Sequence, residues 1–228
     1  QDKRFKGMEE QLRSGWGALL KPLAWQGALC YGPSPSSKAT FTHPASLLKN
    51  WNGLPDPAEA APAVIKRYLS AYGPATPETF DAWLSRNSNK KSTLRSWFAS
   101  LGEQIVEVRV EGETRYLLAK HEDELAATRP SRATHLLGAF DQFVLGPGTK
   151  DTHMLAHEHR PLVSKAAGWI APVLTQGGRI TGVWEMDDGN LVVTPFPGEQ
   201  APPSQVLEDA AARLTAVHGS VKVTPRVD

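Results

Sequence analysis

Apolar residues recur at helical spacing three times in the middle of the chain. Residues 65–72 place four of them at positions i, i+3, i+4 and i+7, which predicts a helix that ends at a Gly-Pro pair. Residues 76–78 (Thr-Pro-Glu) provide the N-cap, the first-turn proline and the first-turn acid of a second helix. The helical spacing returns at residues 94–101, and Gly102 sits where this third helix ends.

Over residues 104–119 the helical spacing of apolar residues gives way to a period of two residues. Val106, Val108 and Val110 alternate with charged residues, and Gly112 then turns the chain into a second alternating run, which predicts a β-hairpin. Three short helices followed by a hairpin is the order of a winged helix-turn-helix. In that motif the third helix lies in the DNA major groove. We therefore predict a complete winged-helix unit over residues 62–128.

The first part of the chain has the pattern expected for the end of a similar unit. Residues 8–30 carry apolar positions at helical spacing with Pro22 as a kink or break, and residues 29–43 predict a loose hairpin with a strand at 39–42. Residues 52–62 hold three prolines and are interpreted as a linker. We expect residues 1–50 to form part of a winged-helix unit, so that two such units stand in tandem.

The last hundred residues are predicted to be mostly strands. Strands are expected over residues 135–145, 169–174, 179–184 and 191–195, with turns at 177–178 and 188–189, a helix over 203–218 and a final strand over 221–224. The fold class is α+β, with tandem winged helix-turn-helix units followed over residues 129–228 by a small antiparallel β-barrel-like domain with a C-terminal helix.

Composition excludes several classes of protein. The chain has 228 residues, of which 40% are hydrophobic and 21% charged, which argues against disorder and a coiled coil. No apolar run reaches the roughly 18 residues needed to cross a bilayer. The single cysteine, Cys30, forms no internal disulfide, which favours the cytoplasm. Residues 1–6 show no export signal, and because the chain opens on Gln1 instead of Met we expect that an upstream segment has been removed.

Charge is unevenly distributed along a chain whose net charge is only +1. Residues 1–101 contain 13 Lys and Arg against 7 Asp and Glu, whereas residues 102–128 contain 3 against 7. A basic front half suggests a face that binds a polyanion, although an excess of this size also occurs on solvated helices.

Several sequence segments resemble one family of bacterial proteins. They are RYLSAYGPAT at 67–76, the hairpin at 107–119, FDQFVLG at 140–146, GWIAPV at 168–173, GRITGVW at 178–184 and GALLKPLAWQGALCYGP at 17–33. In this order they resemble the AlkZ and YcaQ type of winged-helix DNA glycosylase. The resemblance implies three winged-helix units in tandem and a β-barrel around a channel for duplex DNA, with this chain holding most of the second unit, all of the third and the barrel.

The family's catalytic motif, Gln-x-Gln or Gln-x-Asp in the first unit, is absent from this chain. None of its glutamines has Gln or Asp two residues later. An alkylated base is already a good leaving group, so the enzyme mainly extrudes it and orients a water molecule against the sugar. We therefore expect DNA binding without base excision and assign no catalytic residue. Asp141 is a possible carboxylate, although such a residue more often caps a turn.

Candidate DNA contacts lie mainly on the third predicted helix, off its apolar face. They are Lys90, Lys91, Ser92, Thr93, Arg95 and Ser96. Arg109 and Arg115 in the hairpin are weaker candidates, because Glu111 and Glu113 at its tip repel phosphate. Basic residues near the start of the chain are further candidates that would line the same channel: Lys21 and Lys38, with Lys3, Arg4, Lys6 and Arg13.

Other polar and aromatic residues are assigned no ligand. His153, His157 and His159 have a spacing that could place three imidazoles near one metal, but Pro161 and the lack of a fourth ligand favour exposed histidines. We expect no metal and no cofactor. Trp16, Trp83 and Trp97 fall on apolar stripes and are interpreted as core.

Two alternative functions remain open. A winged-helix transcriptional regulator without catalytic activity would bind one DNA sequence selectively and would need a ligand or dimerisation site in the C-terminal half. A module whose hairpins bind protein fits the basic front half less well. The preferred hypothesis is a monomeric protein that binds double-stranded DNA, makes no membrane contact and is associated with the nucleoid in the bacterial cytoplasm.

Overall fold

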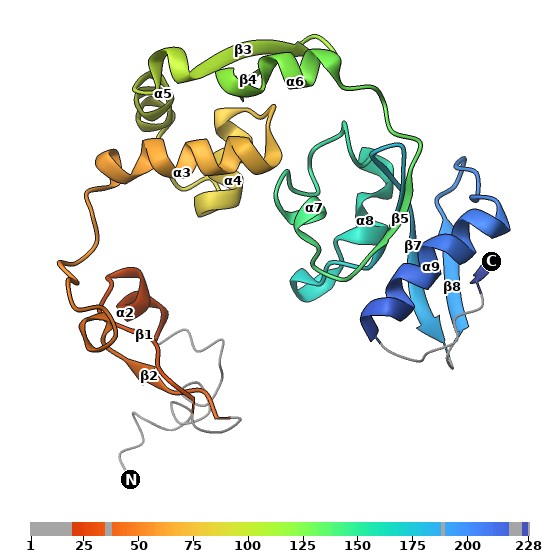
Figure 1. Cartoon of the computed structure of the whole chain (residues 1–228), viewed down its shortest axis with the longest axis horizontal. Coiled ribbons are helices and arrows are strands. Elements are labelled where there is room, and N and C mark those ends of the chain that lie inside the picture. The colour runs from red at the N-terminus through yellow and green to blue at the C-terminus, as the bar shows by residue number, and fades with distance from the viewer. Residues whose placement is uncertain (1–19, 35–37, 188–189, 219–224, 228) are drawn as a thin grey trace. The chain divides into compact units, whose positions relative to one another are not determined.

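The computed structural model describes residues 20–34, 38–187, 190–218 and 225–227 (Figure 1). The chain divides into two compact units, Gln1–Ala60 and Ala61–Asp228. The boundary expected near residue 128 therefore lies inside the second unit. None of the helices in the described ranges is both long enough and apolar enough to cross a membrane.

The first unit contains a short helix and a small hairpin. Its elements are α2 (Lys21–Trp25), β1 (Cys30–Tyr31), β2 (Phe41–Thr42) and the 3-10 helix η2 (Pro44–Ser46). β1 and β2 pair antiparallel, and the rings of Tyr31 and Phe41 stack with centroids 5.3 Å apart, which confirms the predicted hairpin. Pro22 lies in the first turn of α2, where its missing N–H costs no hydrogen bond, so it does not kink this helix, and a break before α2 would fall outside the described residues. The rest of the helix expected over 8–30 lies outside the described residues before residue 20.

The segment predicted as a linker is in part a helix. α3 spans Pro57–Tyr72 and includes the second half of residues 52–62. It begins where the Asp56 carboxylate accepts a hydrogen bond from the Ala58 amide at 2.7 Å, and Pro57 needs no partner at the first helical position. Of the three prolines of this region, Pro55 precedes the helix, Pro57 starts it and Pro62 lies inside it.

Two further helices pack against α3. α4 (Pro77–Ser85) starts at the predicted residue, and Thr76 and Thr79 form a capping box in which each side chain binds the other's backbone amide. α5 spans Lys91–Ala99 and is followed by the 3-10 helix η3 (Gly102–Gln104). One core joins these helices through buried residues that include Ile65, Tyr68, Phe80, Leu94 and Phe98.

The predicted β-hairpin is confirmed. β3 (Ile105–Val110) pairs antiparallel with β4 (Glu113–Leu118), and Glu111 and Gly112 turn the chain with φ angles of 48° and 88°. The positive φ angles are those of a type I′ turn, which suits the right-handed twist of the strands. Tyr116 also forms an isolated bridge with Ala75, which ties the hairpin to the start of α4. We call α3, α4, α5, β3 and β4 together the helix-hairpin unit.

A five-stranded sheet forms the remainder of the second unit. Its strands are β5 (Thr134–Leu137), β6 (Val173–Gln176), β7 (Arg179–Asp187), β8 (Asn190–Pro195) and β9 (Pro225–Val227), in that order across the sheet. The first four pair antiparallel, whereas β8 and β9 are parallel. In the described part of the chain β5 and β9 are the two edges, so these strands form an open sheet and not a closed barrel.

Several predicted strand boundaries are wrong. The second half of 135–145 forms the helix α7 (Gln142–Leu145), because Asp141 caps it. The start of 169–174 follows the 3-10 helix η6 (Ala166–Gly168), and its strand begins only at Val173. The turn at 177–178 is confirmed, whereas the turn at 188–189 and the strand at 221–224 lie outside the described residues. The remaining elements are η4 (Ala119–His121), α6 (Glu122–Ala127), η5 (His157–His159) and α8 (Arg160–Val163).

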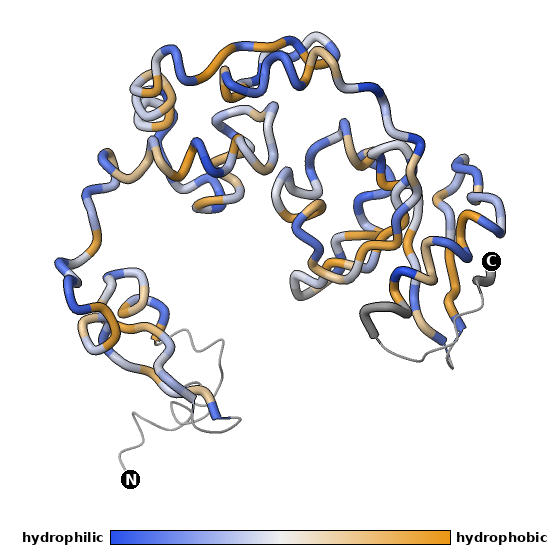
Figure 2. Tube along the Cα trace, viewed as in Figure 1, coloured by the Kyte–Doolittle hydropathy of each residue, from blue (hydrophilic) through white to orange (hydrophobic). Residues whose placement is uncertain are grey.

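The sheet is covered on both faces. α9 (Ser204–His218), the predicted C-terminal helix, packs Leu207, Ala210 and Ala211 against strand residues such as Leu191. A second apolar cluster includes Val144 of α7, Val163 of α8 and Ile180 of β7. In Figure 2 the run of β8 is mostly hydrophobic, whereas polar and apolar segments alternate along α9. Because both faces of the sheet are covered, residues of β8 that point to either face are buried, and the strand is a continuous apolar run.

Candidate nucleic-acid interface

α5 presents a polar, cationic surface on the side away from its core. Leu94 and Phe98 are buried, whereas five of the predicted contact residues are exposed: Lys90, Lys91, Ser92, Arg95 and Ser96. Thr93 is half-buried. Within the described ranges, the ammonium and guanidinium groups of Lys90, Lys91 and Arg95 have no carboxylate partner. These three positive charges are therefore available to a ligand.

The buried carboxylate of Asp81 holds the turn that positions α5. Asp81 is 1% exposed and accepts hydrogen bonds from the hydroxyl of Ser85, from the Asn89 side-chain amide at 2.7 Å and from the Asn89 backbone amide at 3.3 Å. The turn passes through left-handed conformations at Arg86 and Asn87, with φ angles of 58° and 63°. A non-glycine backbone in this region is strained, so the Asp81 contacts stabilise an unusual geometry.

Sequence analysis did not single out Asp81. Its position on α4 beside the apolar residue Phe80 gave no indication of a buried charge. The available signal was the spacing of its partners, because Ser85 lies four residues later, one helical turn away, and Asn89 follows in the turn.

Arg109 and Arg115 of the hairpin have different surroundings. Arg109 is exposed and donates a hydrogen bond to the Thr114 hydroxyl at 2.7 Å. Arg115 is 8% exposed, and its guanidinium binds both oxygens of Asp151, at 3.1 and 3.4 Å, and a Glu113 oxygen at 2.9 Å. Burial alone would lower the pKa of Arg115, but its contacts with Asp151 and Glu113 outweigh burial and raise it. The guanidinium is thus charged and engaged inside the protein, which argues against its predicted contact with DNA.

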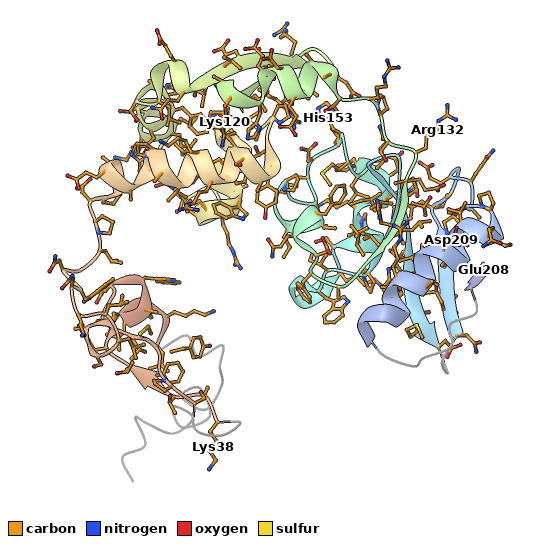
Figure 3. All side chains as sticks on the ribbon, in the orientation of Figure 1. Lys38, Lys120, Arg132, His153, Glu208 and Asp209 are labelled. Atoms are coloured by element: carbon orange, nitrogen blue, oxygen red, sulfur yellow. The ribbon has the colours of Figure 1, made fainter. Side chains whose placement is uncertain are left out.

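The two acidic residues at the hairpin tip are paired with cationic or ionisable groups of the second unit. A carboxylate oxygen of Glu111 lies 2.9 Å from Nδ1 of His153. A carboxylate oxygen of Glu113 lies 3.5 Å from Nε2 of the same ring and is also paired with Arg115. In Figure 3, His153 is labelled beside the end of the hairpin. These contacts attach the hairpin tip to the loop that precedes α8. The expected repulsion of phosphate is therefore reduced at Glu113, which is paired with Arg115.

Other predicted basic contacts belong to the first unit, whereas α5 belongs to the second. Lys21 in α2 and Lys38 are both exposed, and Lys38 is labelled in Figure 3. Each takes part in an interaction within the protein. Lys3, Arg4, Lys6 and Arg13 lie outside the described residues, before residue 20.

A cleft of about 780 Å³ opens between α4 and residues 147–153. The turn before α5 contributes Arg86 and Asn87 to its wall, and the C-terminal half contributes Lys150 and Arg160. The cleft wall thus carries cations from two segments that are far apart in sequence, together with Arg115 and the acidic residues Glu78, Glu113 and Asp151.

Of the three histidines expected to be exposed, only His157 is exposed, and the other polar candidates have structural partners. Asp141 accepts a hydrogen bond from the Phe143 amide at 2.8 Å and caps α7, as the more common role of such a residue predicts. His153 contacts Glu111, whereas the ring of His159 lies with its centroid 4.6 Å from that of Phe196. Throughout the described ranges, no group of three His, Cys, Asp or Glu residues could hold a metal ion.

The predicted core tryptophans differ in burial. Trp83 is 40% exposed, although its ring lies 5.1 Å from that of Tyr68, so the core prediction is wrong for this residue. Trp97 is partly buried against the helix core, and Trp16 lies outside the described residues. The apolar stripe on α4 is wider than the surface that α3 covers.

Comparison with known proteins identifies the family. A family model described as "DNA glycosylase AlkZ-like" matches residues 3–217. The chain belongs to the AlkZ-like DNA glycosylase family. The chain is 55% identical over 227 residues to the interstrand DNA cross-link repair glycosylase of Streptomyces sahachiroi, a match that covers 99% of this chain and 61% of the relative. The solved structure of the Streptomyces sahachiroi DNA glycosylase AlkZ matches with a TM-score of 0.90 and 54% identity, over 100% of this chain and 62% of that one.

Two sequence segments that resemble the AlkZ-like family meet in space. FDQFVLG and GWIAPV lie some 25 residues apart along the chain, yet the rings of Phe140 and Trp169 pack edge to face with centroids 5.0 Å apart. FDQFVLG also contacts the helix-hairpin unit, because Tyr68 donates a hydrogen bond to the Gly146 carbonyl at 3.2 Å. Their shared contacts explain how separate segments can both be needed for one fold.

Proposed function

We propose that this chain is the duplex-binding part of an AlkZ-like DNA glycosylase. In this proposal the helix-hairpin unit is a winged helix-turn-helix, α5 enters the major groove, and β3 and β4 form the wing. The observation that carries the proposal is the exposed row of unpaired cations on α5, held in place by the Asp81 turn. Such groups supply the phosphate and base-edge contacts of DNA-binding helices.

We further propose that the whole protein removes damaged bases from DNA. The 55% identical relative is named an interstrand DNA cross-link repair glycosylase, and the present chain spans about three fifths of its length. No glutamine of these 228 residues starts the motif expected to orient the attacking water. The chemistry is then assigned to residues outside this chain, and the chain itself binds and orients the duplex. Monomeric action at the bacterial nucleoid stays a prediction from sequence.

Fluorescence anisotropy tests the binding proposal. We expect the chain to bind duplexes of unrelated sequence with similar affinity, because contacts to phosphate carry no sequence information. The affinity should fall steeply with salt. In a plot of the logarithm of the affinity against the logarithm of the salt concentration, each neutralised phosphate should add about one unit to the negative slope. Tight binding to one sequence with little salt dependence would instead support the transcriptional regulator.

A further inference from the structure

A small cavity in the C-terminal half is surrounded by cationic and hydroxyl groups. It has a volume of about 200 Å³ and lies between the end of α7 and the start of α8. Its wall consists of Thr149, Lys150, Thr152, Leu155, His157 and Arg160. We call it the Arg160 pocket. None of the residues that form its wall is acidic.

The cations of the Arg160 pocket are not neutralised by the protein. The Nε of Arg160 donates a hydrogen bond to the Thr149 hydroxyl at 3.2 Å, which orients the guanidinium and leaves its two terminal amino groups without a partner in the described structure. Lys150 and His157 are exposed and have no ion pair within the described ranges. The two acids next to wall residues in sequence are Asp151, which is already bound to Arg115, and Glu158, which is exposed and does not line the pocket.

This arrangement suits a phosphate group. A guanidinium presents paired N–H donors in a fixed plane, a lysine adds a mobile positive charge, and the threonine hydroxyls donate further hydrogen bonds. Arg115 provides the contrast, because it lies close by in the same cleft and is bidentate on a carboxylate of the protein itself. A cation that is oriented by a hydroxyl yet lacks an anion is the one available to an external phosphate.

The Arg160 pocket adjoins the larger cleft, whose wall includes the turn that precedes α5. Thr149, Lys150, Thr152 and Arg160 line both cavities, and Arg86 from the turn before α5 lines the larger one. The cleft also has three acidic residues in its wall. Glu113 and Asp151 are bound to Arg115, and Glu78 lies in the first turn of α4. A DNA backbone that follows the cations can therefore pass from α5 across Arg86 to the pocket.

We propose that the Arg160 pocket binds a backbone phosphate of the same duplex that α5 contacts. This inference rests on the proposed function and adds to it a second attachment point on the C-terminal half of the chain. Two anchors on different parts of the second unit would fix the direction of the duplex as well as its position, since one helix alone can pivot in the groove.

The test compares double variants of the whole chain with equal loss of charge. Lys150→Ala/Arg160→Ala removes the pocket cations, and Lys165→Ala/Arg179→Ala removes two exposed cations that line neither cavity. We expect the pocket variant to bind duplex about tenfold more weakly, since hydrogen bonds to charged groups are the strong class. Its salt slope should be smaller by about one unit, the contribution of one phosphate. The control variant should bind nearly as the unchanged chain does.

Single variants show whether weaker binding by the double variant comes from lost contacts or from misfolding. Lys150→Ala changes an exposed residue and should lower affinity with the thermal midpoint unchanged, and Arg160→Lys should bind with intermediate affinity because it keeps the charge without the paired donors. If the pocket and control variants bind equally well while Lys91→Ala/Arg95→Ala binds weakly, the pocket proposal is wrong and the proposed function stands. If the unchanged chain binds no duplex, both are wrong.

Titration with inorganic phosphate distinguishes a site for a DNA backbone phosphate from a site for a free small anion. Titration calorimetry of the unchanged chain with phosphate should show weak binding that the pocket variant lacks, and duplex DNA should compete with it. Tight phosphate binding that persists in the presence of saturating duplex would show a separate small-anion site and would overturn the proposal.

Discussion

Single buried charges decide the geometry of the candidate interface. Asp81 and Arg115 both lie below one tenth exposure, and each is surrounded by hydrogen-bond partners that a sequence pattern does not reveal. From sequence, Arg115 was a weaker candidate for contact with DNA, because Glu111 and Glu113 lie at the tip of its hairpin. The structure instead pairs it with Asp151, 36 residues later, a long-range contact that no local spacing predicts. At the residue scale, partner choice depends on the tertiary fold.

Replacement of Asp81 tests the role of the turn. Asp81→Ala leaves the amide of Asn89 and the hydroxyl of Ser85 without their acceptor, so we expect the free energy of unfolding to fall by about 2–3 kcal/mol. Urea denaturation measures this loss. Ser88→Ala in the same turn changes an exposed side chain and should cost less than about 0.5 kcal/mol. Equal losses in the two variants would show that Asp81 does not hold the turn.

The Arg115–Asp151 pair should behave as a buried ion pair. Arg115→Met leaves a buried carboxylate without its cation and should lower the free energy of unfolding by about 3–5 kcal/mol. Adding Asp151→Asn removes that charge but keeps an acceptor for the His153 amide, so the double variant should be more stable than Arg115→Met alone.

The exposed Arg109 is the matched control for Arg115. Arg109→Ala loses one hydrogen bond to Thr114 at the surface and should cost about 0.5 kcal/mol or less. A loss for Arg115→Met as small as that for Arg109→Ala would contradict the pairing, and thermal or urea unfolding of both variants decides it.

At the scale of elements, sequence predicted what local chemistry determines. The N-cap at Thr76, the alternation of β3 and β4 and the amphipathic α9 all depend on neighbours along the chain, and all three were found as predicted. The helix at Pro57 was missed because prolines were read as linker residues, although one of them starts the helix. The helix α7 was missed because residues 142–145 are apolar enough to resemble a strand.

The contact between α3 and the start of the C-terminal half leaves no space at Gly146. A Cβ added at Gly146 would lie 2.0 Å from the Tyr72 ring, and the Gly146 carbonyl also accepts the Tyr68 hydroxyl. Gly146→Ala should therefore lower the free energy of unfolding by about 1–3 kcal/mol, the usual cost of overpacking. Gly138→Ala has open space around it and serves as the control in the same denaturation experiment. Equal stabilities would mean that the two elements do not pack closely.

For the whole molecule, the sequence is enough to identify the family, but it does not show which parts of the chain contact DNA. Segments spread over most of the chain pointed to the glycosylase family, and the family model covers residues 3–217. From sequence, the main candidates for DNA contact could be placed on the exposed face of α5, and they stay predictions. Arg86 and Arg160 line the same cleft, and no periodicity along the sequence brings those two residues together.

A base-release assay tests the proposed absence of catalysis. On duplex DNA containing 7-methylguanine, the 228-residue chain should release no base, because none of its glutamines begins a Gln-x-Gln or Gln-x-Asp motif. A chain extended upstream by a winged-helix unit that carries Gln-x-Gln or Gln-x-Asp should release it. Release by the short chain, abolished in Asp141→Asn, would show that the α7 cap does the chemistry instead.

The most direct test of the central claim is the affinity of Lys91→Ala/Arg95→Ala for duplex DNA, measured by fluorescence anisotropy over a range of salt concentrations. Both residues are exposed on α5 and form no ion pair in the described structure, so the thermal midpoint should stay nearly unchanged. We predict weaker binding than the unchanged chain and a salt slope smaller by about two units, one for each cation removed. Lys165→Ala/Arg179→Ala, with the same loss of charge, should keep both the affinity and the slope. A Lys91/Arg95 variant that binds as the control does would contradict the account, because α5 would then face away from DNA.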